Sequence, residues 1–331
     1  MNNKYSDKNN INLRWGIIGC GAVTEVKSGP AFQKTDGFTI AAVMRRNEAL
    51  AKDYAQRHNI AKYYSDADEL INDASIGAVY IATPPDSHKL YGLKVAAAGK
   101  ICCIEKPLAP SYQDSIEILT AFEHANTPLF VSYYRRSLPR FNKIKALIEQ
   151  GEIGNIRHIN WHLSKAASEL DLSKQYNWRT DKDVALGGYF DDLASHGLDL
   201  FTYLLGDYET VKGIGLNQQG HYSSFDAVSA CWLHKNGITG TGSWNFGSCS
   251  RQDKVTIYGS EGEVTFSIFD EAPIVITSKT KQQELFIENP ENIQLYHVKN
   301  IKEQLCGDSQ HPSNGNSAVH TSWVMEQILS G

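Results

Sequence analysis

Two short groups of residues carry side chains that could move protons between a substrate and the protein. In the first, Glu105 and Lys106 follow directly on the apolar run Cys102–Ile104 and precede Pro107. A charged pair at the end of an apolar strand is costly unless it faces a polar cleft. A lysine in such a place can have its pKa lowered by burial and act as a general acid or base. An ordinary salt bridge at the strand end is the alternative interpretation.

The second group lies on a predicted helix, Tyr189–Leu205, which follows the glycine pair Gly187–Gly188. At about 100° per residue, the apolar side chains of this helix share one face, and Asp192, His196 and Asp199 share the opposite one. A carboxylate and an imidazole one turn apart could serve a reaction, whereas a surface pair four residues apart is the structural alternative. We interpret the glycine pair as room for the close approach of a ligand, which favours function.

A glycine-rich turn near the start of the chain indicates a dinucleotide. The apolar run Trp15–Ile18 leads into Gly19 and Gly21, and Ala22–Val23 then open a helix. In this context the first glycine permits a tight turn, and the second lets the backbone approach a pyrophosphate at the helix N-terminus. Thr24 replaces the third glycine of the fingerprint, so a turn without a ligand is the alternative.

The residues after the second apolar run favour NADP over NAD. Enzymes that use NAD usually place an acidic residue there for the ribose hydroxyls, whereas this chain has Arg45 and Arg46. A guanidinium can bind the 2′-phosphate through charge-assisted hydrogen bonds. A solvated surface pair is the alternative. We therefore expect NADP as the cofactor, with NAD possible.

Length and composition exclude several classes of protein. The chain has 331 residues, of which 41% are apolar and 21% charged, and its net charge is −5. This composition is globular, and an acidic chain without a basic run is unsuited to nucleic acid or an anionic membrane. Six cysteines without a C-x-x-C pair predict neither a disulfide framework nor a zinc site. The first ten residues are polar and contain no signal-peptide core. We expect a cytoplasmic protein that binds a small molecule and needs no metal.

The elements that must position these groups fall into two domains. In residues 1–131 short apolar runs alternate with amphipathic segments, which predicts a nucleotide-binding domain with a parallel Rossmann sheet. In residues 132–331 alternating strands joined by short turns predict a substrate-binding α+β domain with a largely antiparallel sheet. The predicted strands are Arg14–Ile18, Thr39–Met44, Ala78–Ala82, Ile101–Ile104, Leu129–Val131, Arg157–Leu163, Ala227–Leu233, Ile238–Trp244, Lys254–Tyr258 and Glu263–Ile268.

The sheet of the second domain is also the predicted dimer interface. The segment Phe225–Leu233 carries apolar or aromatic side chains on both faces. Helices that cover one face only would leave apolar surface exposed on the other in a monomer. We therefore expect a homodimer or a higher homo-oligomer formed through this sheet.

Taken together, these segments resemble the glucose-fructose oxidoreductase/inositol dehydrogenase/MocA family over about Leu13–Phe269. The most specific matches are Glu105–Pro107 and the helix that carries Asp192 and His196 after the glycine pair, and the loop Thr83–His88 also fits. The resemblance implies a Rossmann domain followed by an α/β domain with a largely antiparallel sheet, which often dimerises through its open face.

The resemblance also implies roles for single residues. The family's catalytic lysine falls on Lys106, and its aspartate and histidine fall on Asp192 and His196. Positions that the family uses around the cofactor fall on Thr83, Pro84, His88, Glu105, Trp178 and Arg179. What is implied is hydride transfer between NAD(P)(H) and a sugar-like polyol, aldose or ketosugar, with Lys106 and His196 in proton transfer. The missing acidic residue favours NADP-using members, such as the anhydrofructose reductase type. An NAD(P)-dependent glycosidase and a non-catalytic, cofactor-sensing regulator are the alternatives.

Overall fold

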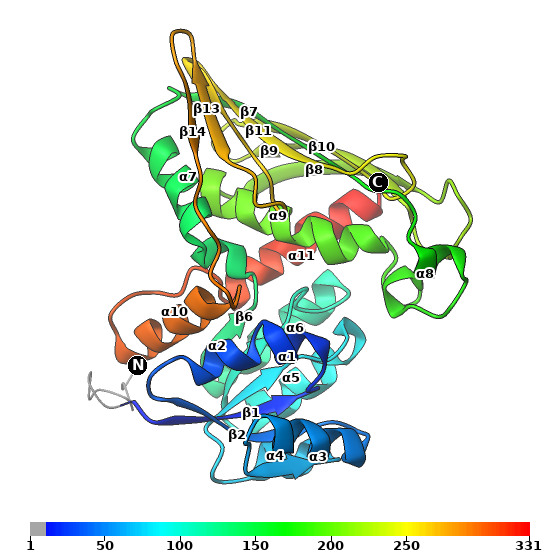
Figure 1. Cartoon of the computed structure of the whole chain (residues 1–331), viewed down its shortest axis with the longest axis vertical. Coiled ribbons are helices and arrows are strands. Elements are labelled where there is room, and N and C mark those ends of the chain that lie inside the picture. Colours follow the sequence, from blue (N-terminus) through cyan, green and yellow to red (C-terminus); the bar gives the residue numbers. More distant parts are fainter. Residues whose placement is uncertain (1–10) are drawn as a thin grey trace. The chain divides into compact units, whose positions relative to one another are not determined.

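The computed structural model describes residues 11–331, and these residues form two compact units (Figure 1). The first unit contains the chain up to Leu138 and a later segment, Pro290–Val319. The second contains Pro139–Asn289 and His320–Gly331. The predicted division at residues 131 and 132 differs from this arrangement. The prediction places all of residues 132–331 in one domain, because no motif in the sequence marks the return of the chain to the first unit at Pro290.

The first unit is built on a six-stranded parallel sheet with the order β3-β2-β1-β4-β5-β6. This is the strand order of a doubly wound dinucleotide-binding domain, so the predicted Rossmann sheet is confirmed. The three-residue edge strand β3 was not predicted, because its Lys-Tyr-Tyr sequence has no apolar run. The strands are β1 (Leu13–Ile18), β2 (Phe38–Met44), β3 (Lys62–Tyr64), β4 (Ala78–Ile81), β5 (Ile101–Ile104) and β6 (Leu129–Val131).

Helices pack on both faces of this sheet (Figure 1). Successive side chains of a strand point to opposite faces, so Cys103 lies in the core on one side and its neighbour Cys102 in the core on the other. The returning segment supplies α10, whose buried face joins the core of Cys103. The helices are α1 (Ala22–Val26), α2 (Gly29–Gln33), α3 (Glu48–Arg57), α4 (Ala67–Asn72), α5 (His88–Ala97), α6 (Tyr112–Ala125), α10 (Leu295–Cys306) and the first residues of α11 (Gly315–Leu329), with 3-10 turns at Pro85–Ser87 and Tyr134–Ser137.

The second unit is built on an eight-stranded sheet with the order β14-β13-β12-β11-β7-β10-β9-β8. Its neighbouring strands are antiparallel except for β7 and β10, which confirms the predicted, largely antiparallel sheet. The strands are β7 (Ile156–Ser164), β8 (Tyr208–Leu216), β9 (Ala227–His234), β10 (Thr239–Asn245), β11 (Gln252–Gly259), β12 (Gly262–Phe266), β13 (Ile274–Ser278) and β14 (Gln282–Leu285).

One face of this sheet is covered by α7 (Pro139–Glu149), α9 (Tyr189–Leu205) and the C-terminal part of α11 (Figure 1). At Gly197, α9 lies so close to the sheet that a Cβ atom there would be 2.4 Å from the ring of Trp161 on β7. Phe201 packs edge-on against the same ring, with 5.6 Å between ring centroids. The helix predicted over about these residues is confirmed, and this tight packing holds its polar residues in place.

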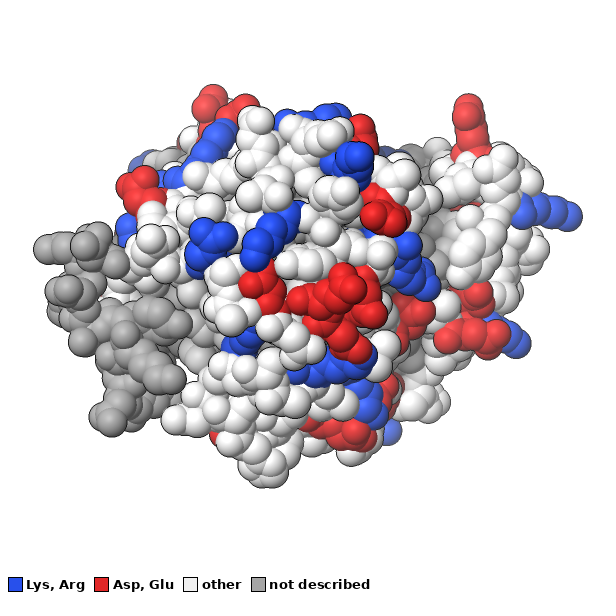
Figure 2. Space-filling view, turned by 90° about the horizontal axis from the view of Figure 1, so that it is seen from below, with Lys and Arg blue, Asp and Glu red and all other residues white. Residues whose placement is uncertain are grey.

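Surface charge is mixed rather than segregated on the face that Figure 2 shows. Outside the grey atoms, acidic and basic side chains alternate over this face without a continuous basic area (Figure 2). The described residues also form surface ion pairs, such as Lys94 with Asp68 at 2.7 Å. Within residues 11–331, no helix combines the length and the apolar character needed to span a membrane.

Candidate active site

The glycine turn after β1 leaves room for a dinucleotide. Gly19 has a φ of +91°, and a Cβ atom there would lie 2.6 Å from the Thr83 side chain, so only glycine fits. A Cβ atom on Gly21 would have only the Gly19 carbonyl oxygen within 4 Å, at 3.8 Å, so the space beside this backbone is open. Thr24 closes the turn, because its hydroxyl accepts a hydrogen bond from the Gly21 N–H at 3.0 Å. Ala22–Val23 begin α1. The turn therefore fits the phosphates of a nucleotide.

The two arginines that favour NADP follow directly on β2. Both side chains are exposed, and neither forms an ion pair with another residue of the described chain. Burial raises the pKa of the Cys20 thiol in the glycine turn to about 11, and the charge of Arg45 opposes this rise. The charge of the Arg45 guanidinium is therefore felt at the glycine turn. An unpaired cation beside a nucleotide cradle is suited to a phosphate.

The loop after β4 is joined to the loop after β5 by a buried histidine. The His88 ring is fully buried, with Nε2 2.8 Å from the Thr83 carbonyl oxygen and Nδ1 2.9 Å from the Pro107 carbonyl oxygen. Burial lowers the pKa of His88, although both carbonyls oppose this shift. In this arrangement His88 supports the two loops from within. Thr83 and the exposed Pro84 form the outer side of the first loop.

Glu105 is held by two residues that the sequence did not indicate. Its carboxylate is only 8% exposed, and Oε1 accepts hydrogen bonds from the Tyr80 hydroxyl and from the Gln294 amide, the latter at 2.8 Å. The main-chain N–H of Lys106 donates to Oε2 at 3.3 Å. Burial, together with the charge of Glu105, raises the pKa of Tyr80 well above its usual value. Glu105, the residue before Lys106, is therefore held by the Tyr80 side chain of β4 and by the Gln294 side chain at the start of α10.

Replacing Gln294 by leucine should lower the free energy of unfolding by about 1–3 kcal/mol, because the buried Glu105 carboxylate loses a donor. We also expect kcat to fall, since Glu105 is then free to shift beside Lys106. Urea unfolding and steady-state turnover measure the two effects. As a control, Gln283→Leu on the exposed strand β14 should change neither. Unchanged stability in Gln294→Leu would show that the amide does not hold Glu105.

In the second unit, α9 carries Asp192 and His196, and Asp192 contacts Arg179, another predicted site residue. Asp192 Oδ2 accepts a hydrogen bond from Arg179 Nε at 3.1 Å, and the Arg179 guanidinium lies 4.3 Å from the centroid of the Trp178 ring. One turn later, His196 is 5% exposed and packs against the Phe269 ring. The predicted pair of carboxylate and imidazole therefore adjoins the Trp178–Arg179 turn.

Asp199 lies on the same side of α9 as Asp192 and His196, as the helical projection predicts, but this side of the helix is covered at Asp199. It is fully buried, and the Thr321 hydroxyl of α11 donates to its carboxylate at 3.0 Å. The projection did not anticipate α11, which supplies this donor. Of the three polar residues on this side of α9, Asp192 is partly exposed, whereas His196 and Asp199 are buried.

The interpretation of Gly187 and Gly188 as room for a ligand is wrong. A Cβ atom on Gly187 would lie 2.6 Å from the Asp191 carboxylate, and one on Gly188 would lie 2.8 Å from the Phe225 carbonyl oxygen. Gly188 also has a φ of +61°. The protein's own backbone and side chains fill this space, so the glycines serve the tight entry into α9.

Lys165 is a half-buried lysine of the second unit that no sequence motif indicated. It follows the last residue of β7, and its ammonium lies 3.4 Å from the centroid of the Tyr189 ring. The Tyr189 hydroxyl in turn donates to Asp171 at 2.6 Å. Burial lowers the pKa of Lys165, and the nearby carboxylates of Asp171 and Asp192 oppose this shift. The run of apolar residues that precedes Glu105 and Lys106 has no counterpart here, because β7 alternates polar and apolar residues and ends at Ser164.

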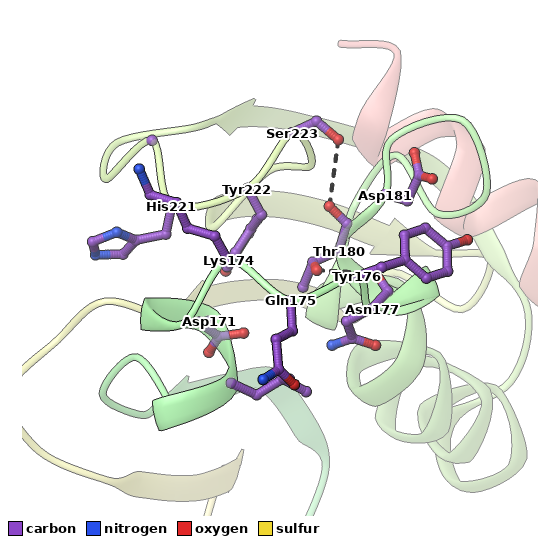
Figure 3. A pocket seen from close by; sticks show the side chains of 12 residues that line it. Asp171, Lys174, Gln175, Tyr176, Asn177, Thr180, Asp181, His221, Tyr222 and Ser223 are labelled. Carbon is purple, nitrogen blue, oxygen red and sulfur yellow. Dashed lines mark hydrogen bonds between the residues drawn. The ribbon is translucent and has the colours of Figure 1, made fainter.

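A pocket of about 420 Å³ opens between two loops of the second unit (Figure 3). The Ser223 hydroxyl donates to the Thr180 carbonyl oxygen at 3.4 Å and joins the two loops. None of the predicted site residues lines this pocket, although Asn177 and Thr180 flank Trp178–Arg179. The lining offers carboxylates, amides, hydroxyls and aromatic rings, which suit a polar ligand; it consists of Leu170, Asp171, Lys174, Gln175, Tyr176, Asn177, Thr180, Asp181, Gly220, His221, Tyr222 and Ser223.

Comparison with known proteins places these features in a family. Residues 13–133 match the family model described as oxidoreductase family, NAD-binding Rossmann fold, and residues 141–265 match the GFO/IDH/MocA C-terminal domain. The chain is 36% identical over 315 residues to Oxidoreductase P35 of Formosa agariphila, covering 95% of this chain and 97% of that protein.

Two further comparisons concern levoglucosan dehydrogenase. The enzyme of Pseudarthrobacter phenanthrenivorans is 27% identical over 288 residues, which is 77% of this chain and 74% of that one. A solved structure of levoglucosan dehydrogenase with NADH and levoglucosan has the same fold, with a TM-score of 0.84 at 22% identity over 96% of both chains. The chain therefore belongs to the glucose-fructose oxidoreductase/inositol dehydrogenase/MocA family of NAD-binding Rossmann oxidoreductases.

Proposed function

We propose that this protein transfers a hydride between NADP(H) and a sugar-like polyol, aldose or ketosugar. The observation that carries the proposal is Lys106 at the end of β5, next to a Glu105 that two buried donors hold in place. Ligands of doubly wound domains bind at the carboxyl edge of the parallel sheet, and Lys106 follows β5 at this edge. Similarity to levoglucosan dehydrogenase supports a sugar derivative as the substrate.

In the proposed reaction the protein's own residues bind the substrate and move a proton. A bound nicotinamide would supply or accept the hydride. Lys106 and His196 act on the oxygen of the reacting carbon, and one of them takes or gives its proton. The protonated partner of the two stabilises an alkoxide as it develops. Asp192 binds a substrate hydroxyl or orients His196.

A screen of sugars and ketosugars with both nicotinamide cofactors, followed by nicotinamide absorbance, tests this function. Steady consumption of NADP⁺ or NADPH with a sugar is the expected result. Release of a chromophore from a glycoside without net change in the cofactor would favour the glycosidase instead. Tight cofactor binding with no turnover over the whole panel would favour the non-catalytic regulator.

The preference for NADP rests on the unpaired Arg45 and Arg46. Arg45→Asp should shift the ratio of kcat/KM for NADPH over NADH by more than about tenfold, or 1.4 kcal/mol, since it replaces attraction of a 2′-phosphate by repulsion. Lys281→Asp, which changes the net charge equally on the exposed β13–β14 hairpin, should leave the ratio unchanged. Tighter binding of NADH than NADPH by the native protein would contradict the preference.

We also propose that the protein dimerises through the open face of its eight-stranded sheet. Gly213 of β8 faces Ile328 of α11, so the next residue, Ile214, points to the other face, where it is 61% exposed. Leu216 and Tyr258 are exposed as well. Apolar side chains on an uncovered sheet face favour association.

Sedimentation at micromolar concentration should therefore give about twice the chain mass of 36.8 kDa. Ile214→Glu should shift the protein toward the monomer, because a carboxylate would be buried in the interface. Leu90→Glu, at an equally exposed apolar position on α5, should leave the dimer intact. A native protein that sediments only at the monomer mass would exclude the interface.

A further inference from the structure

Lys165 presents a cation that no carboxylate of the described chain pairs with. Its main-chain N–H donates to the Asn245 carbonyl oxygen at 3.0 Å, which fixes the residue where β7 ends beside β10. Its half-buried side chain places the ammonium 3.4 Å from the centroid of the Tyr189 ring and 5.7 Å from that of Phe246. Within residues 11–331, no Asp or Glu oxygen lies within 4.0 Å of this nitrogen.

The acidic groups around Lys165 are bonded to other donors. Asp171 accepts hydrogen bonds from the Tyr189 hydroxyl at 2.6 Å and from Ser168, through its N–H and its hydroxyl. Asp192 forms its ion pair with Arg179 at 3.1 Å. The ammonium of Lys165 thus keeps its N–H donors for a group from outside the protein.

The ammonium of Lys165 is a half-buried charge that a bound anion would stabilise more than a neutral hydroxyl would. The positive charges of Arg179 and Arg251 act on Lys165, as do the negative charges of Asp171 and Asp192. Burial is the largest influence, and it lowers the pKa of Lys165. A half-buried charge without an ion-pair partner is costly. A bound anion would offset this cost with a short, charge-assisted hydrogen bond, whereas a hydroxyl would offset less of it.

We propose that Lys165 binds a negatively charged substituent of the substrate, a carboxylate or a sulfate ester, so that the protein acts on acidic sugars. The aromatic faces of Tyr189 and Phe246 hold the ammonium from one side and leave its N–H bonds to the anion. This inference rests on the proposed function and narrows its substrate class. It assigns Lys165 to substrate specificity and leaves proton transfer to Lys106 and His196.

Matched substrate pairs test the inference. D-glucuronate and glucose 6-sulfate are compared with D-glucose, and D-galacturonate with D-galactose, by kcat/KM in the NADP⁺-dependent reaction. We expect kcat/KM to be at least about tenfold higher for an acidic sugar than for its neutral partner, as for one hydrogen bond to a charged group. The carboxylate and sulfate arms show which anion the site accepts. Binding of D-glucuronate to the NADP⁺ complex, measured by calorimetry, provides a readout without turnover.

Three variants assign the preference to Lys165. Lys165→Met keeps the length of the side chain and should remove the preference, by raising KM for the acidic sugar about 10- to 100-fold while kcat for the neutral sugar stays the same. Lys165→Arg keeps the charge and should retain part of the preference. Lys281→Met, which removes an exposed lysine of the β13–β14 hairpin, should behave like the native protein.

The outcomes separate this inference from the function on which it rests. Turnover of neutral and acidic sugars with equal kcat/KM would overturn the role of Lys165 and leave the oxidoreductase intact. Equal losses on both kinds of sugar in Lys165→Met would also overturn it, since they indicate a general catalytic or structural role. A native protein that neither binds NADP⁺ nor converts any sugar would overturn both proposals.

Discussion

Replacing Lys106 by methionine should lower turnover by about 10²- to 10⁴-fold, the usual contribution of a general acid or base. Methionine preserves the length and apolar stem of the side chain but cannot hold or transfer a proton. The affinity for NADPH should stay within a few-fold, because the glycine turn and Arg45 are expected to bind the phosphates. Stopped-flow or steady-state absorbance gives the turnover, and quenching of protein fluorescence gives the affinity.

Lys89→Met is the matched control for this experiment. Lys89 forms ion pairs on the surface of the same unit, with Asp114 and Glu117, each at 2.7 Å. Exposed ion pairs of this kind contribute little stability, so turnover should remain native. If Lys106→Met itself keeps near-native turnover on an identified substrate, Lys106 has no role in proton transfer, and the cofactor-sensing regulator becomes the better account.

The second large effect is expected at His196. His196→Asn should lower turnover about 100-fold, because asparagine can form a hydrogen bond but cannot exchange a proton. We also expect KM for the sugar to rise, since Asp192, one turn earlier on α9, is proposed to bind a substrate hydroxyl or orient this imidazole. A combined fall in kcat and rise in KM distinguishes this residue from Lys106, for which kcat should change most.

A histidine outside the site provides the comparison for His196→Asn. His124 is exposed near the end of α6, and His124→Asn should leave both kinetic constants unchanged. Thermal unfolding of both variants shows whether the packing of α9 has survived. A folded His196→Asn protein with native kcat and KM would remove His196 from the mechanism.

Structure could be predicted from the sequence where a functional side chain lies within a short, locally determined segment. The glycine turn and the end of β5 are short segments in which strand, turn and functional side chain follow one another. The helix predicted over about Tyr189–Leu205 is observed there, because its apolar side chains recur with helical spacing. Short patterns of this kind depend on few distant contacts.

The remainder of the site depends on contacts between distant parts of the chain. Gln294 meets Glu105 only because residues 290–319 return to the first unit, and Asp199 is buried against Thr321 of α11. Gly188 avoids a clash with the Phe225 carbonyl oxygen, which lies on another loop. No periodicity within one segment contains this information. Lys165 was likewise not indicated, because the strand before it alternates polar and apolar residues and its ring contact with Tyr189 joins residues 24 positions apart.

The return of residues 290–319 has a consequence for the biosynthesis of the protein. Val298, Ile301, Leu305 and Cys306 of α10 complete the core that contains Trp15 and Ile17. A ribosome must therefore finish residues 139–289 before the nucleotide-binding unit can close, a delay of roughly ten to thirty seconds at ordinary rates of synthesis. During this interval the nascent unit exposes the apolar side chains that α10 later covers. The unit that begins first is thus completed late, and a fragment ending at Leu138 would lack this part of its core and should aggregate rather than fold.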